Sequence, residues 1–164
     1  MSVNKHEPHV LILPEDDANR QLANGFLLNE SVLTARIQVL PVAGGWLKVL
    51  ETFCASYAST MDRYPARLMV LLIDFDGNRD RLTGAMAKVP SHLTDRVFIL
   101  GTLTEPEDLK KANLGSYEAI GSALAKECHE ESNAVWGHEL LRHNAAEMSR
   151  LRRCVMPILF RQNF

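Results

Sequence analysis

The sequence predicts a doubly wound, Rossmann-like α/β domain with a mostly parallel sheet of about four strands and helices on both faces. Four short runs are continuously apolar, as strands buried on both faces are, and stretches with helical spacing lie between them. Strands that alternate with helices of this length require right-handed crossovers, which place the strands parallel to one another.

The strands and helices can be assigned in chain order. Residues 10–13 (VLIL) predict the first strand, and residues 15–28 predict a helix because apolar side chains recur every four residues and acids lie at its start. The same alternation continues and predicts strands at 36–40, 67–73 and 96–100, with helices at 46–58 and 79–89.

The C-terminal third has helical spacing. Residues 116–131 and 134–154 predict a pair of helices packed on a core at 8–105, so that residues 1–164 form a single domain. This tail is locally basic. A solvated helix face is the ordinary explanation, and contact with phosphate is the alternative, for Arg142, Arg150, Arg152, Arg153 and Arg161.

Composition excludes several classes of protein. A hydrophobic content of 46% with 23% charged residues is that of a globular chain, and a formal net charge of −2 excludes a surface that is basic throughout. Cys54, Cys128 and Cys154 form no C-x-x-C pair, which favours buried thiols in a reducing compartment. No apolar stretch approaches membrane-spanning length, so we expect a cytoplasmic protein without a membrane partner.

Acidic residues follow three of the predicted strands. Glu15 follows the first, Asp74 and Asp76 follow the third, and Glu105 follows the fourth. Ligands of open parallel sheets bind at the carboxyl ends of the strands, and residues i and i+2 leaving a strand point the same way. One acid at such a position is ordinarily a solvated loop residue or a helix cap, but three clusters together predict a site for Mg²⁺.

Two further motifs bear on a possible binding site. Gly44 and Gly45 precede a predicted helix, where their backbone N–H groups could approach a phosphate, although this pair is also common in tight turns. His138 and His143 flank the sequence HELLRH, but they are five residues apart where a zinc-protease helix needs four. We therefore reject a zinc protease, and the roles of both histidines stay open.

Three segments together resemble the Toprim domain of topoisomerases, bacterial primases and overcoming-lysogenization-defect nucleases: residues 10–20 (VLILPEDDANR), 37–48 (IQVLPVAGGWLK) and 68–78 (LMVLLIDFDGN). The resemblance spans roughly residues 8–105. It implies that Glu15 is the acid/base or a metal ligand and that Asp74 and Asp76 bind Mg²⁺ or Mn²⁺. Glu105, and less surely Glu107, would match the further acid of nuclease-type members.

The function implied by this resemblance is metal-dependent phosphoryl transfer or nuclease action on nucleic acid, with a partner such as an ATPase. Asp16 and Asn19 depart from the family pattern, where a glycine and an acid are usual, so a catalytically silent binding module stays open. A receiver-like domain with Asp74 as phosphoacceptor is a further alternative. No lysine follows Lys126 to neutralise the phosphate, which argues against it.

Overall fold

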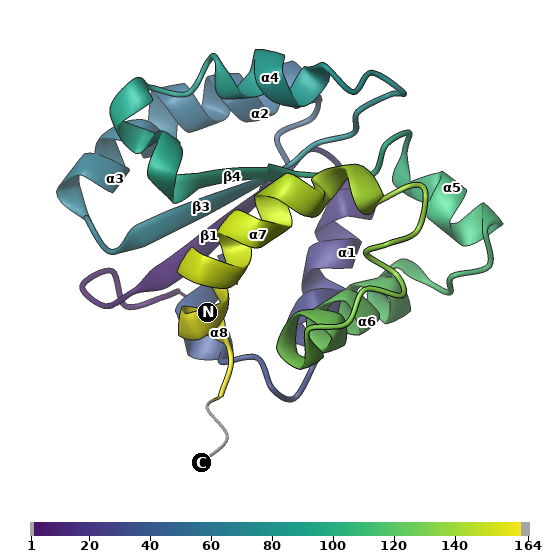
Figure 1. Ribbon diagram of the computed structural model, residues 1–164. Coiled ribbons are helices and arrows are strands. Elements are labelled where there is room, and N and C mark those ends of the chain that lie inside the picture. The colour runs from purple at the N-terminus through teal and green to yellow at the C-terminus, as the bar shows by residue number, and fades with distance from the viewer. Residues whose placement is uncertain (1, 162–164) are drawn as a thin grey trace.

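The computed structural model describes residues 2–161 and contains a four-stranded sheet in which every pair of neighbours is parallel (Figure 1). The strand order is β2-β1-β3-β4. Helices cover both faces, which confirms the predicted fold class. The strands are β1 His9–Pro14, β2 Ile37–Val39, β3 Arg67–Leu72 and β4 Val97–Leu100.

The helical segments occur mainly between the strands and after the last one. In chain order they are α1 Asp17–Leu27, a 3₁₀ turn Thr34–Arg36, α2 Trp46–Thr52, a π-helical segment Phe53–Tyr57, α3 Ala58–Arg63, α4 Arg81–Met86, a 3₁₀ segment Ser91–Arg96, α5 Pro106–Lys111, α6 Tyr117–Glu130, a 3₁₀ turn Arg142–Asn144, α7 Ala145–Cys154 and α8 Met156–Leu159.

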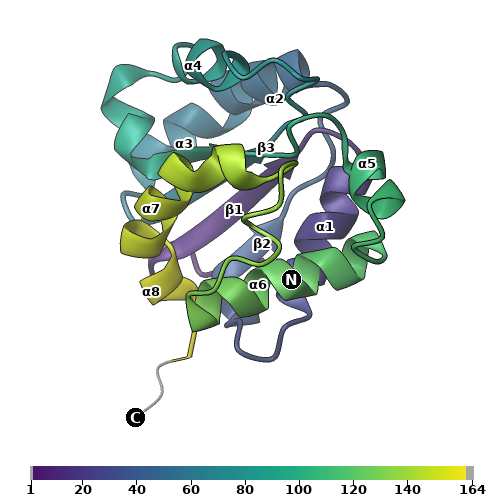
Figure 2. The same ribbon diagram turned by 45° about the vertical axis from the view of Figure 1, so that its right-hand side comes forward.

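Side-chain alternation along β1 divides the interior into two layers. Leu11 and Leu13 belong to a core shared with α2, α3 and α4, while Val10 and Ile12 face a second core that includes α1, α6 and α7. Figures 1 and 2 show the two groups of helices on opposite faces of the sheet. Because both faces are covered, β1 and β3 are continuously apolar after their first residues, His9 and Arg67, and β4 is apolar throughout.

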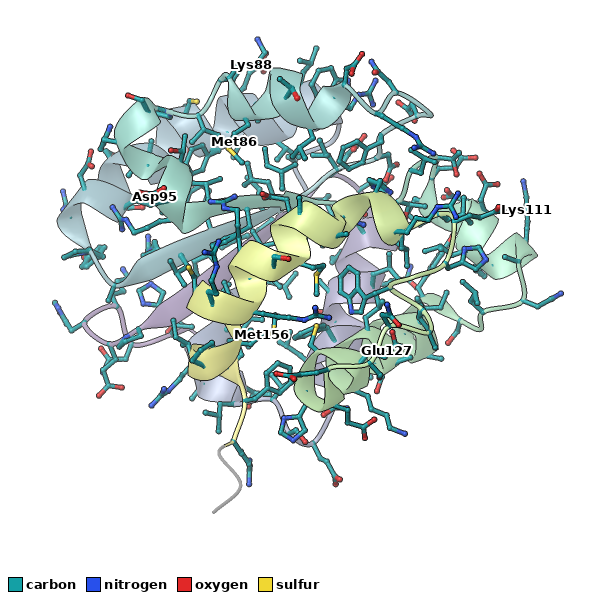
Figure 3. The ribbon with its side chains drawn as sticks, viewed as in Figure 1. Met86, Lys88, Asp95, Lys111, Glu127 and Met156 are labelled. Carbon is teal, nitrogen blue, oxygen red and sulfur yellow. The ribbon has the colours of Figure 1, made fainter. Side chains whose placement is uncertain are left out.

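Three predicted helices differ in extent from the observed ones. The helix predicted at 46–58 continues to Arg63 through the π-helical segment, and the one at 79–89 is helical only over Arg81–Met86. The prediction of a helix at 134–154 is wrong over its first part, because only α7 and the preceding 3₁₀ turn form there. The buried carboxylate of Glu127 in α6 accepts hydrogen bonds from Val135 N and Trp136 N, which holds this segment in turns (Figure 3).

The outer edge of β4 is covered by side chains from the segment around α7. Arg150 donates to Val97 O, Glu147 accepts from Ile99 N at 2.9 Å, and Asn144 bonds both Gly101 N and Gly101 O. The three side chains recur every three residues along the helical segment, while their partners recur every two along the strand. The polar groups of this edge are thus bonded without a fifth strand.

Helices α1 and α6 pack closely through two glycines. A Cβ added at Gly25 would lie 2.2 Å from Glu118 O, and one added at Gly121 would lie 2.1 Å from Leu22 O. Only glycine permits this backbone contact. Among the described residues, no helix combines the length and the apolar character that crossing a membrane requires.

Candidate functional site: an acidic cluster at the carboxyl edge of the sheet

The strand order reverses at the carboxyl ends of β1 and β3, which is where open α/β sheets bind their ligands. From the central strand β1 the chain goes to β2 on one side, and β3 lies on the other, so the strand order reverses between them. Glu15 directly follows β1, and its backbone N–H still bonds Leu72 O of β3 at 2.9 Å. We call the four acids at this point the acidic edge: Glu15, Asp16, Asp74 and Asp76.

Hydrogen bonds join three of these acids through buried groups. Glu15 Oε2 accepts from the backbone N–H of Asp74 at 2.6 Å. The buried Asn19 side chain, in the first turn of α1, donates to Asp74 Oδ1 at 2.9 Å and to Asp16 Oδ1 at 3.0 Å. Asp16 also accepts from Asn19 N and so caps α1. The start of α1 therefore fixes the position of the carboxylate that follows β3.

Asp76 has a different environment from Asp74. Asp74 is 7% exposed, whereas the Asp76 side chain is 58% exposed and accepts from Arg81 Nη1 at 2.7 Å. The prediction that both carboxylates leave the strand in the same direction assumed an extended chain, but β3 ends at Leu72 and Asp76 has a left-handed φ of +49°. Arg81 Nη1 also donates to Asp74 O, and its guanidinium lies over the Trp46 ring, 4.4 Å from the centroid.

Crowding and burial make two of the acids weaker than usual. Desolvation raises the pKa of Asp74 to about 7; the charges of Glu15, Asp16 and Asp76 also raise it, and the Asn19 hydrogen bond opposes them. The pKa of Glu15 is likewise raised, first by desolvation and then by the charges of Asp16 and Asp76. The positive charge of Arg81 does not cancel this crowding.

The other predicted site residues lie around this cluster. Gly44 N donates to Glu15 O at 2.8 Å, and Gly44 and Gly45 have φ values of +97° and +152° that favour glycine. Glu105 is exposed at the start of α5 and makes no capping hydrogen bond. Its neighbour Thr104 accepts from Asp76 N at 3.2 Å, which brings the loop after β4 against the loop after β3.

Sequence reasoning missed three polar side chains near the site. Asn19 was noted only as a departure from a family pattern, and nothing in the sequence distinguishes Arg81 from a solvated arginine. Tyr117 begins α6, and the pKa of its hydroxyl is raised by desolvation and then by the charges of nearby acids, Glu107 first among them. No sequence signal marks these three residues, because the burial of Asn19 and the contacts of Arg81 depend on the tertiary fold.

Within residues 2–161, no three or more His, Cys, Asp or Glu side chains are arranged to hold a metal ion by themselves. The histidines do not form a pair either: His138 Nδ1 accepts from Leu140 N, and the His143 ring packs edge-on against Phe75. Both ring nitrogens of His143 are buried with no hydrogen-bond partner among the described residues, and burial lowers its pKa.

Comparison with known proteins adds no relative: no protein-family model, curated protein or solved structure matches the chain. Its chemistry is therefore inferred from the acidic edge. Each of the two central carboxylates has one oxygen fixed by a hydrogen bond. The other oxygens, Glu15 Oε1 and Asp74 Oδ2, accept none from the part of the chain that the structure describes.

Proposed function

We propose that the acidic edge carries Mg²⁺- or Mn²⁺-dependent phosphoryl transfer of the nuclease type on nucleic acid. The observation that carries the proposal is the pair of crowded carboxylates, Glu15 and Asp74, which follow neighbouring parallel strands at the switch point of the sheet. A divalent cation would offset the desolvation and the like-charge repulsion that raise their pKa values. The order of residues that resembles the Toprim family supports the same chemistry.

The side chains of the acidic edge fit a Mg²⁺ ion that takes only part of its ligands from the protein. Mg²⁺ is usually bound through one or two carboxylates, several waters and the phosphates of the substrate rather than by a complete protein cage. Glu15 and Asp74 would supply the two carboxylates, because among residues 2–161 the expected ligands Asp76 and Glu105 do not join them in a group of three or more that could hold an ion. When bound, the cation would neutralise charge on the phosphate and on the attacking and leaving oxygens.

Residues of this chain would orient the two carboxylates and accept the proton of the attacking water. The Asp74 N–H orients Glu15, and Asn19 orients Asp74, so neither carboxylate is free to rotate away from the acidic edge. Glu15, whose pKa is raised, would accept a proton from the attacking water as the water oxygen bonds phosphorus and the bond to the leaving oxygen breaks. Arg81, held over Trp46 and bonded to Asp76, would supply the positive charge nearest the phosphate.

The basic residues best placed to contact nucleic acid are not the C-terminal arginines. Arg150 donates hydrogen bonds to Glu147 and to the backbone of β4. Because α7 runs antiparallel to β4, Arg152 and Arg153 lie toward the amino ends of the strands, away from the acidic edge. Other exposed basic side chains lie closer to the acidic edge, in α2, in the loop after β3 and in α5: Lys48, Arg79, Lys110 and Lys111. Figure 3 shows Lys111 projecting outward.

The location proposed for this activity is the reducing cytoplasm. All three cysteines are free, and two of them, Cys54 and Cys154, are exposed. An oxidising compartment would leave exposed thiols open to disulfide exchange. An ATPase partner, which the resemblance to nuclease-type proteins implies, is proposed on that resemblance alone.

A cleavage assay tests the function. Supercoiled DNA and structured RNA are incubated with protein and Mn²⁺, and we expect Glu15→Gln and Asp74→Asn each to lower the cleavage rate by about 10²-fold or more. Asp80→Asn, which changes an exposed acid of the loop between β3 and α4, is the matched control and should cleave like the wild type.

Three other outcomes would each overturn the proposal. Cleavage that persists in both variants would show that a contaminant is responsible. Labelling of Asp74 by a small phosphodonor without any cleavage would establish a receiver-like phosphoacceptor. Neither activity, together with no metal binding, would favour a catalytically silent binding module, whose partner a pull-down would then identify.

A further inference from the structure

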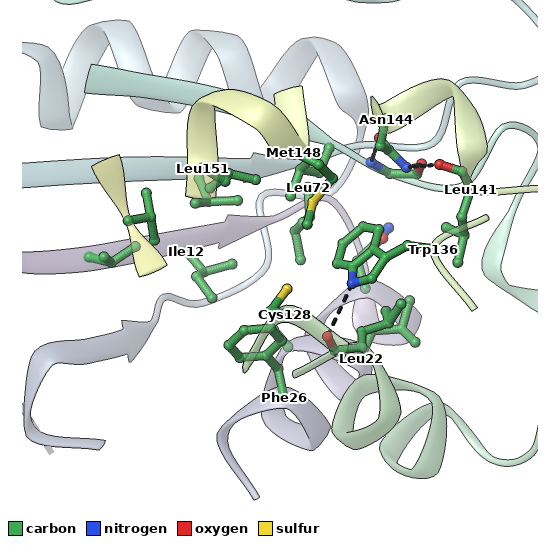
Figure 4. Close-up of a pocket in the computed structure, with 18 of the residues that line it drawn as sticks. Ile12, Leu22, Phe26, Leu72, Cys128, Trp136, Leu141, Asn144, Met148 and Leu151 are labelled. Atoms are coloured by element: carbon green, nitrogen blue, oxygen red, sulfur yellow. Dashed lines mark hydrogen bonds between the residues drawn. The ribbon is translucent and has the colours of Figure 1, made fainter. Parts of the chain in front are cut away.

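Two regions outside the acidic edge differ in what they offer a ligand. An apolar cavity of about 100 Å³ lies between the sheet and helices α1, α6 and α7 (Figure 4). The Trp136 indole and the Asn144 amide in its lining are bonded to backbone carbonyls, and Thr102 Oγ1 is enclosed, so no polar group there selects a ligand. The second region is a group of basic side chains at the amino end of the sheet.

The centre of this second region is a buried arginine. Arg67 begins β3 and lies opposite His9, the first residue of β1, in the parallel register. It is only 4% exposed. Its Nε donates to His9 Nε2 at 2.9 Å, and its Nη1 donates to Thr60 Oγ1 at 2.8 Å. The guanidinium carbon lies 5.1 Å from the centroid of the Tyr64 ring, so neighbouring side chains fix the orientation of the guanidinium.

The partners of Arg67 carry no negative charge. His9 Nε2 accepts from Arg67 and is therefore unprotonated, while its Nδ1, 2.7 Å from Glu7 O, donates. Burial lowers the pKa of His9, and the charges of Arg67 and Lys5 lower it further. No carboxylate of residues 2–161 forms an ion pair with Arg67. Because a buried cation without a counter-ion is unfavourable, this position favours an anion supplied from outside.

Part of the guanidinium is still available to such an anion. An arginine has five N–H donors, and the bonds to His9 and Thr60 use the one on Nε and one of the two on Nη1. Nη2 makes no hydrogen bond with residues 2–161, and unlike the Nε of Arg81 it is not shut off from solvent. The remaining donors of Nη1 and Nη2 can bind two oxygens of one anion.

Further basic groups surround Tyr64. The Lys5 Nζ lies 5.6 Å from the centroid of the Tyr64 ring, and the His6 ring packs edge-on against it at 5.9 Å between centroids. Both side chains are exposed and belong to the loop before β1, so they can turn toward an anion at Arg67. The acids nearest along the chain, Glu7 and Asp62, form no ion pair with any of these groups. We call Lys5, His6, Tyr64 and Arg67 the basic cluster.

We propose that the basic cluster binds a phosphate group. Arg67 would hold two phosphate oxygens, and Lys5 would offset the second negative charge. The phosphate could be free or at the end of a nucleic acid strand, since both present the same tetrahedral dianion. The basic cluster lies at the amino ends of β1 and β3, and the acidic edge lies at their carboxyl ends, so this proposal does not depend on the function proposed above.

NMR of the intact ¹⁵N-labelled wild-type protein in EDTA tests the proposal with inorganic phosphate as the probe. Phosphate should shift the Arg67 Nε–H signal and the amide signal of His9 saturably, with a Kd on the order of 1 mM. The amide signals of Glu15 and Asp74 should not move, and sodium chloride at the same ionic strength should not reproduce the shifts. Lack of a saturable shift at Arg67 would overturn the proposal, whether or not any variant folds.

A matched pair of variants tests the contribution of the lysine. Lys5→Gln removes an exposed charge of the basic cluster and should raise the Kd for phosphate roughly twofold to fivefold. Lys126→Gln removes an exposed charge from α6 and should leave the Kd unchanged. Equal Kd values for the wild type and Lys5→Gln would overturn the role of Lys5.

A thymidine dinucleotide with and without a 5′-phosphate distinguishes the two sources of the phosphate. A response of the Arg67 signal to inorganic phosphate and to the phosphorylated dinucleotide alone would support a strand end as the ligand. A response to inorganic phosphate and to neither dinucleotide would support free phosphate. Equal responses to both dinucleotides would overturn the preference for a dianion.

Discussion

At the scale of single residues, burial changes the acidity of Asp74 more than the neighbouring charges do. Desolvation is the largest contribution to its raised pKa, and the charges of Glu15, Asp16 and Asp76 add to it. The folded protein therefore holds a proton on Asp74 up to about pH 7, whereas the carboxyl of an unfolded chain loses it near its ordinary pKa of 3.8.

This difference makes stability depend on pH in a definite direction. Between the two pKa values the native state binds more protons than the unfolded state, so the contribution of Asp74 to stability is lost as pH rises through about 7. Asp74→Asn keeps a neutral side chain at every pH. We expect its free energy of unfolding to exceed that of the wild type by roughly 2–4 kcal/mol at about pH 8 and to match it near pH 4.

Urea denaturation in the presence of EDTA measures this effect. Asp80→Asn changes an exposed acid nearby and should follow the wild-type pH profile, which controls for general charge effects. Parallel profiles for the wild type and Asp74→Asn would show that Asp74 titrates as an ordinary surface carboxyl.

Some site residues could be placed from the sequence and others could not, because strand topology determines the position of some and tertiary contacts determine that of the rest. Glu15 and Asp74 could be placed at one edge because the carboxyl ends of parallel strands meet there. The pairing of Asp76 with Arg81 could not, because it depends on the left-handed turn at Asp76 and on the support of Trp46. Asn19 lies at a contact between α1 and the residues after β3, and no local pattern shows that contact.

At the scale of elements, the distance between α1 and α6 is set by glycine. Gly121→Ala would place a methyl group against the backbone of Leu22, and we expect a loss of about 2–3 kcal/mol in the free energy of unfolding. Thermal or urea denaturation measures it. Gly84→Ala in α4 is the matched control, because no atom lies within 4 Å of its added Cβ and helix propensity predicts a gain of about 0.5–1 kcal/mol.

Equal effects of the two substitutions would contradict the close packing of α1 on α6. The glycines themselves were visible in the sequence, but their neighbours were not. The spacing of apolar residues identified both helices, and only the fold shows which of their faces meet.

Two other elements show where local patterns were insufficient. The helix expected over 134–154 is interrupted because the Glu127 carboxylate bonds the backbone N–H groups of Val135 and Trp136, a tertiary contact that overrides helix propensity. Helix α5 was missed although Pro106 begins it, acids occupy its first turn and lysines its last. Those start and stop features are readable, so α5 could have been predicted.

At the scale of the whole molecule, the C-terminal segment contacts both lateral edges of the sheet, at β4 and next to β2. Residues around α7 bond the outer edge of β4, and beyond α7, Leu159 O accepts from Leu33 N on the β2 side. The segment between these contacts packs on the apolar face of the sheet to which Val10 and Ile12 belong. Glu15 and Asp74, at the carboxyl edge of the sheet, have their hydrogen-bond partners within this edge and in α1 rather than in α7.

The claim that Glu15 and Asp74 bind a divalent cation is tested most directly by Mn²⁺ titration of ¹⁵N-labelled protein. Paramagnetic broadening should affect the amide signals of Glu15, Asn19 and Asp74 first, and Asp74→Asn should need about tenfold more Mn²⁺ or higher for the same effect. Signals of these residues that persist while others broaden, or unchanged broadening in Asp74→Asn, would contradict a metal site at the acidic edge.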